Sequence, residues 1–294
     1  ALIRDYGGYE KVFTDFVDDN DVKWLISNLQ YHDVLSSHTA IHGSSARKEF
    51  EYVFKQKRIL DSSDYGIDPF QGCNQLIYLV LSDITYHDVL LKQEWAVINS
   101  TTDGSIIDSN YSLALIKREF YKKTVRVADK LSKEIQECQP DKQKLELFMT
   151  DNVDQHILLF ELIRLSCQLY LLQNIRKVPP SAHELQSLLH DALEITDKLL
   201  GTRMMTCMAF PILVSGMTCT EAEDRQEMEI RIQRYVAGYP NGNTKFVRSI
   251  IHEAWKENPD GNICLNWAEI AQEKGWKIFI SRVSILLIIH VTDA

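Results

Sequence analysis

The residues with the clearest chemical potential are two His-Asp pairs, each inside a copy of the same pentapeptide. The sequence Tyr-His-Asp-Val-Leu occurs at residues 31–35 and again at residues 86–90. Imidazole and carboxylate groups both bind divalent metal ions, and His38 and His42, four residues apart, would be able to add further ligands. The pattern therefore raises a metal-binding hypothesis.

A structural role explains these pairs better. The helical HD phosphohydrolases, which bind a divalent ion through a His-Asp dyad, need a further His upstream, and no His precedes His32. His32 and His87 each continue an apolar helical stripe. We interpret both as histidines packed between helices, and we expect no metal and no cofactor. Tyr31 and His32 stay candidates for polar contact with a ligand. The repeat itself is not taken as an internal duplication, because a match of five residues does not establish one.

The second candidate is the pair Glu161 and Arg164, which lies within the apolar run from Ile157 to Leu172. Residues three apart on a helix can face each other and form an ion pair. A charge within an apolar helix is costly unless it is satisfied. The pair therefore either sits at a water-exposed edge of its helix or serves as a polar anchor in a pocket, for example for a zwitterionic ligand.

The third candidate is the segment around Phe210 and Pro211. Pro211 is expected to interrupt a helix at Phe210, and a Ser-Gly pair follows at Ser215. An interrupted helix exposes backbone polar groups that a ligand can use. Methionine, which adapts to irregular surfaces, occurs at residues 204, 205, 208 and 217. We therefore predict ligand contacts from Met208, Phe210 and Ser215, with ordinary core packing as the alternative.

Composition and motifs narrow the function classes. The sequence has no phosphate-binding loop, G-x-S-x-G, Cys-His nucleophile pattern or H-E-x-x-H. Its net charge of −9 argues against direct contact with nucleic acid, because DNA-binding surfaces are basic, although a small basic patch is compatible with that total. The six cysteines form no C-x2-C pair, so we expect reduced thiols. No signal peptide is visible, and the apolar stretch 285–289 is far shorter than the ~20 residues of a membrane helix, so we expect no membrane contact.

Helical periodicity and capping patterns place these candidates on an all-α fold. Capping boxes are predicted at Ser181 with Glu184, Thr220 with Glu223 and Asn266 with Glu269, and Gly275 is a predicted helix stop. The expected helices span 21–36, 47–54, 74–91, 111–137, 142–175 with a break near 151–152, 181–199, 220–236, 243 or 244 to 256, and a short one from 266, with loops at 61–69 and 99–110. We predict a single multi-helix domain of roughly ten helices over residues 1–276. An apolar C-terminal tail, residues 277–294, is expected to be a strand or an interface segment.

Three blocks of sequence share their order and spacing with a known family. They are Ala1-Leu2-Ile3 through Gly7-Gly8; Trp24-Leu25-Ile26 through Leu35 followed by residues 66–72; and Phe210-Pro211, Ser215-Gly216, Glu223-Asp224-Arg225, Trp255 and Gly275-Trp276. Together they resemble the second class of fungal-specific transcription factor regulatory domain. The resemblance spans most of the chain, and it implies that the chain begins inside the expected domain.

This resemblance implies an all-α domain that follows a zinc-cluster DNA-binding module in a transcription activator of the nucleus, with shuttling to the cytoplasm left open. It implies a small metabolite bound between helices, partners among the transcription machinery or co-regulators, and no enzyme activity; a homodimer is left open. We favour an amino acid or a γ-aminobutyrate-like metabolite, because residues 31–33 and Asp68-Pro69 look closer to the γ-aminobutyrate-type regulators. A sterol-sensing domain of the same family and a ligand-free helical dimerisation scaffold are the alternatives.

Overall fold

The computed structural model describes residues 5–16, 19–37, 73–100, 109–140, 145, 152–240 and 242–276. These residues contain helices and no strand, which confirms the predicted all-α class. The helices are α2 (Tyr9–Asp15), α3 (Asn20–Ser37), α5 (Gln75–Ser100), α6 (Ser109–Glu137), α8 (Val153–Asn174), α9 (His183–Leu199), the 3-10 helix η3 (Arg203–Cys207), α10 (Ala209–Thr218), α11 (Ala222–Gly238), α12 (Gly242–Glu257) and α13 (Trp267–Glu273). None of the described helices has the length and apolar content needed to cross a membrane.

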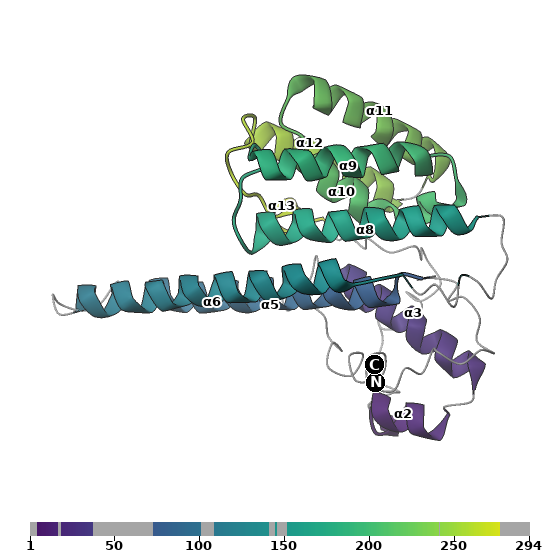
Figure 1. Cartoon of the computed structure of the whole chain (residues 1–294), viewed down its shortest axis with the longest axis horizontal. Coiled ribbons are helices and arrows are strands. Elements are labelled where there is room, and N and C mark those ends of the chain that lie inside the picture. Colours follow the sequence, from purple (N-terminus) through teal and green to yellow (C-terminus); the bar gives the residue numbers. More distant parts are fainter. Residues whose placement is uncertain are drawn as a thin grey trace.

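The molecule consists of a helical bundle and a long two-helix hairpin (Figure 1). The bundle contains α8 to α13, with α8 along its base. The hairpin consists of α5 and α6, which run side by side beneath α8 and continue well beyond the bundle. The N-terminal helix α3 packs against α5 and contributes little to the bundle itself.

Helix α5 is the element that joins the parts. Its first half is apolar around most of the circumference, and Ile77, Leu81 and Ile84 are completely buried. Such a helix needs neighbours on several sides, because an apolar surface left in water costs free energy. Helices α3, α6 and α8 supply these neighbours. The predicted helix 74–91 is therefore confirmed, and it continues to Ser100, into the segment expected to be a loop.

Helix α10 forms the centre of the bundle. Every residue from Phe210 to Thr218 is buried, and α8, α9 and α12 surround the helix. The expected interruption at Phe210 is wrong: α10 begins at Ala209, so Pro211 lies in its first turn. A first-turn N–H has no intrahelical partner in any case, so Pro is tolerated there.

Two of the three predicted capping boxes are wrong. Helices α9 and α11 begin at His183 and Ala222, and neither N-cap side chain makes a capping bond. The Ser181 hydroxyl instead donates to the Asn262 side-chain oxygen at 2.9 Å, because the turn at 258–262 packs against this segment. The Ser181 hydroxyl is therefore used in a tertiary hydrogen bond and does not cap the helix.

The predicted cap at Asn266 is confirmed, since its side chain accepts a bond from the Ala268 N–H at 2.8 Å, while the Glu269 carboxylate pairs with Lys92. Gly275 has a φ of 67° and ends this segment, while the Trp276 N–H donates to the Ala271 carbonyl. Helix α12 begins at Gly242, so the expected start at residue 243 or 244 lies inside the helix. The predictions for residues 47–54, 61–69 and 277–294 lie outside the described residues.

Gly216 sets the separation of α10 and α12. A Cβ atom at this position would lie 2.5 Å from the Ile251 Cδ1 atom. The Trp255 indole N–H donates to the Gly216 carbonyl at 2.7 Å, which fixes the two helices together. Close approach therefore depends on the missing side chain at residue 216.

We expect Gly216→Ala to lower the free energy of unfolding by about 1–2 kcal/mol, because steric overlap with Ile251 outweighs the better helix propensity of Ala. The matched control is Gly238→Ala, where the added Cβ meets only the flexible end of Met205. Urea denaturation of both variants, and of Gly216→Ala combined with Ile251→Val, tests this. Equal stability of the two single variants, or no recovery in the double variant, would contradict it.

Candidate functional site

The predicted pair Tyr31 and His32 lies where α3 packs against α5. Tyr31 is fully buried, and its ring meets the ring of Tyr78 edge-on with 5.5 Å between centroids. His32 is half-buried, and burial lowers the pKa of its imidazole because the charged form is poorly solvated there. The structure therefore places both residues at an interior contact.

Buried polar side chains concentrate on these two helices. Half of the buried polar side chains among the described residues lie on α3, on α5 or immediately before α5. They are Lys23, Ser27, Asn28 and Gln30, followed by Asn74, Ser82, Asp83, Thr85 and Asp88, and we call this set the α3–α5 polar region. Interior polar groups are costly unless they are hydrogen-bonded. The two helices therefore bury donors, acceptors and charges, and Asp88, at the far end of the set, is paired with Lys92 beside α13.

Ser82 is the most informative member of the polar region. Its side chain is 2% exposed, yet its hydroxyl has no hydrogen-bond partner in the described parts of the chain. Buried Ser and Thr side chains in helices commonly donate to the carbonyl four residues earlier, as Ser166 does to Leu162 at 2.7 Å. The Ser82 hydroxyl makes no such bond, so its hydrogen-bonding capacity is open to another group.

Glu161 and Arg164 form the ion pair expected from their spacing. The Arg164 Nε atom lies 2.8 Å from a Glu161 carboxylate oxygen, and the side chains are 28% and 35% exposed for Arg164 and Glu161. The pair therefore sits at a partly exposed edge of α8. A ligand held by either charge would have to open this pair.

Met208, Phe210 and Ser215 lie in the closed core around α10. All three side chains are almost completely buried. Phe210 packs with Tyr170 and Trp267, with ring centroids 6.1 and 6.3 Å away. The Ser215 hydroxyl, like that of Ser82, has no hydrogen-bond partner among the described residues.

The hollow that the structure shows beside this core is small. It has a volume of about 10 Å³ and is lined by residues that include Gln173, Met217, Cys219, Arg225 and Trp255. That volume suits about one water molecule and not a metabolite. The three groups of predicted residues thus occupy three settings, on α3, α8 and α10: an interior polar contact, a helix edge and a closed core.

A charge cluster around the buried Asp88 was not predicted as a site. Lys92 bridges Asp88 on α5 at 3.0 Å and Glu269 on α13 at 3.2 Å. Burial raises the pKa of Asp88, an effect that attraction to Lys92 and Lys177 only partly offsets. Burial, together with repulsion from Asp88 and Glu269, raises the pKa of the Tyr170 hydroxyl. The only sequence signal for this cluster was the second pentapeptide.

The two copies of the pentapeptide occupy different environments. In the first copy Tyr31 is buried and Asp33 is partly exposed, whereas in the second Tyr86 is partly exposed and Asp88 is buried. Equivalent positions thus face different surroundings, as expected of a coincidental repeat. Within the described ranges, no group of three or more His, Cys, Asp or Glu side chains is placed to hold a metal ion.

Comparison with known proteins points to one family. The model of the family described as fungal specific transcription factor domain matches residues 1–281. An uncharacterized transcriptional regulatory protein of Schizosaccharomyces pombe is 26% identical over 285 residues, covering 94% of this chain and 48% of that relative. The transcriptional activator protein UGA3 of Saccharomyces cerevisiae is 24% identical over 252 residues, covering 81% of this chain and 43% of the relative.

The chain spans about half the length of these curated relatives. No solved structure matches it.

We expect Asp88→Asn to raise the free energy of unfolding at pH 7.5 by about 1 kcal/mol. The folded-state pKa of Asp88 is raised above its ordinary value of 3.8, so its stabilising contribution is fully present below that value and is lost as the pH rises through the folded pKa. The ionised carboxylate therefore costs stability at neutral pH. Lys92 is 35% exposed and keeps Glu269 as a partner, so the variant leaves no isolated buried cation.

Denaturation curves at pH 4 and pH 7.5 test this expectation, with the exposed Asp129→Asn as the matched control. The free energy of unfolding should increase only at pH 7.5, and only in the Asp88→Asn variant. A loss of stability at pH 7.5 would show that the ion pair with Lys92 outweighs the desolvation of the carboxylate.

Proposed function

We propose that this chain, which belongs to the family of fungal specific transcription factor domains, is the metabolite-responsive regulatory domain of a transcription activator. Its relatives by name regulate or activate transcription, which supports a regulatory role exerted by binding and not by catalysis. In this proposal the domain works in the nucleus beside a zinc-cluster DNA-binding module. Its partners are the transcription machinery or co-regulators.

The proposed ligand is a small zwitterion, such as an amino acid or a γ-aminobutyrate-like compound. The observation that supports it is the α3–α5 polar region, where Lys23 on α3 and Asp83 on α5 supply buried charges of both signs. A zwitterion needs an anion and a cation at short separation, together with neutral donors and acceptors. Tyr31, His32 and the Ser82 hydroxyl are the neutral groups proposed to complete the site.

The proposed mechanism is a shift in how α3 packs on α5. A ligand that prefers one packing increases the population of that packing by its difference in affinity for the two. Helix α5 also contacts α6 and α8, so a change at α3 is able to reach both the hairpin and the bundle. Glu161, Arg164 and the α10 residues then act as scaffold around the moving contact.

The second candidate function is a ligand-free helical scaffold for dimerisation. The closed core around α10 favours it, because the adjacent hollow holds about one water molecule. A scaffold needs only rigid packing, which Met208, Phe210 and their neighbours supply.

A thermal-shift screen with amino acids, γ-aminobutyrate and sterols separates the two functions. A ligand at 100 times its dissociation constant adds about 2.7 kcal/mol of stability. We expect a zwitterionic compound to raise the melting temperature and sterols to leave it unchanged. If no compound changes the melting temperature, the scaffold function is favoured.

The variant Ser82→Ala then locates the site. It removes a hydroxyl that has no partner among the described residues, so the unliganded protein should keep its stability. The ligand's affinity should fall by up to about tenfold, the equivalent of one hydrogen bond. The matched control Ser166→Ala removes a hydroxyl bonded to Leu162, so it should lower stability and leave affinity unchanged. Unchanged affinity in Ser82→Ala would place the ligand elsewhere.

A further inference from the structure

The hairpin extends beyond the bundle as an arm. The ion pairs Lys92–Glu269 and Asp129–Arg176 connect the hairpin to α13 and to the end of α8. Beyond these pairs, residues 93–100 of α5 and 109–128 of α6 form a projection that we call the arm (Figure 1). The arm therefore presents helix surface that the bundle does not cover.

Contacts between its own two helices hold the arm together. The Trp95 ring on α5 lies 5.0 Å from the ring of Phe120 and 5.6 Å from that of Tyr121, both on α6. The Lys117 ammonium lies 5.7 Å from the Trp95 ring centroid, and Lys123 pairs with Glu94 across the helices. The hairpin is thus a preformed structure whose outer face is available for another purpose.

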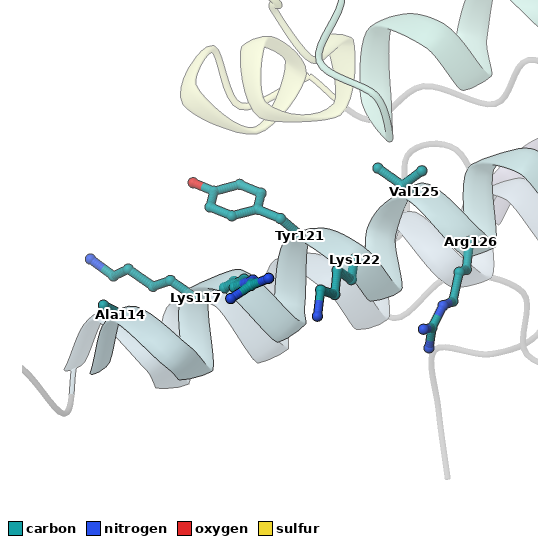
Figure 2. A pocket seen from close by; sticks show the side chains of 7 residues that line it. Ala114, Lys117, Tyr121, Lys122, Val125 and Arg126 are labelled. Carbon is teal, nitrogen blue, oxygen red and sulfur yellow. The ribbon is translucent and has the colours of Figure 1, made fainter. Parts of the chain in front are cut away.

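The outer face of α6 carries a shallow hollow that is largely open to solvent, and all seven residues that line it belong to this one helix (Figure 2). Tyr121 and Val125 form its apolar part and are 56% and 46% exposed. They precede the buried Ala128 by seven and three residues, so they continue along α6 the helix face that is buried nearer the bundle. This continuity distinguishes them from scattered exposed apolar residues, which need no explanation.

Cations surround this apolar part. Lys117, Arg118, Lys122 and Arg126 line the same hollow. With Lys123 they give the arm five cations against two acids, Glu94 and Glu119, a net charge of +3 in a chain whose total is −9. Among the described residues, neither Arg118 nor Arg126 forms an ion pair. The face is therefore both apolar and strongly basic.

We propose that this face of α6 docks an acidic amphipathic helix of a separate protein. The apolar side of such a helix fits over Tyr121 and Val125, while its carboxylates meet the surrounding cations. A second copy of the chain would bring two arms of like charge together, which is unfavourable. Nucleic acid would use the cations and leave the apolar centre unmatched, because phosphates and sugars provide no apolar counterpart.

This inference deepens the proposed regulatory function, on which it rests, by naming the surface that a co-regulator would use. It does not depend on metabolite binding, because the arm lies apart from the α3–α5 polar region. A failure of the metabolite screen and a failure of the docking experiment are therefore separate results.

The experiment uses the 294-residue chain and a fluorescent synthetic helical peptide with Leu on one face and Glu on the flanking positions. Anisotropy titrations compare the wild type with Arg118→Glu/Arg126→Glu and with Tyr121→Ser. The matched control is Lys130→Glu/Lys133→Glu, the same charge change on the same helix outside the arm. We expect both arm variants to bind at least about tenfold more weakly and the control to bind within about twofold of the wild type.

Two peptide controls test the chemistry. A peptide with Lys in place of Glu, and one with Ser in place of Leu, should each bind at least about tenfold more weakly. Circular dichroism checks that the variants are folded, and Tyr121→Ser tests the surface independently if the charge-reversed protein does not fold.

Four results would overturn the proposal. They are equal peptide binding by the arm and control variants, equal binding of the Glu and Lys peptides, tighter binding of a DNA duplex that the arm substitutions abolish, and self-association that the same substitutions abolish. The last two would assign the face to nucleic acid or to a second copy of this chain.

Discussion

The rest of the structure depends on the burial of α5 on several sides at once. A helix whose first half is apolar around most of its circumference cannot be left on a surface, so α3, α6 and α8 must all pack on it. That requirement connects the N-terminal helices to the bundle. It also places Ser82, Asp83 and Thr85 of this half of α5 in the interior, which explains why the α3–α5 polar region lies there and not at the periphery.

The bundle and the α3–α5 polar region differ in the kind of side chain that they bury. Around α10 the core is apolar and closed, with helices drawn together at Gly216 and fixed by the Trp255 bond. Around α3 and α5, charges and amides replace part of the apolar contact. An apolar core is specified by the fit of its shapes, whereas buried polar groups must each find a hydrogen-bond partner. The two parts of the molecule therefore depend on different kinds of contact.

Sequence patterns predicted the helices well and the surroundings of individual side chains poorly. Periodicity located α6 because an amphipathic stripe is a local property of the chain. The caps predicted at Ser181 and Thr220 are wrong, because Ser181 contacts a distant turn and helix α11 begins after Glu221, and no local pattern records either fact. Pro211 was predicted to interrupt a helix. A proline is tolerated in the first turn, however, and a local pattern does not show that the helix begins at Ala209. The Asp88 cluster could not be predicted, because it forms where α5, α8 and α13 meet and no local sequence pattern records that contact.

The continuity of α5 has a mechanical consequence. One uninterrupted helix runs from Ser82 in the polar region to Ser100 on the arm, a length of about 27 Å at 1.5 Å per residue. A rigid rod of that length pivoting by about 5° at one end displaces its other end by roughly 2 Å, since the displacement is the product of length and angle. Helix α5 therefore has the geometry of a lever, because any rotation of its buried half would be carried to the arm by the same continuous helix.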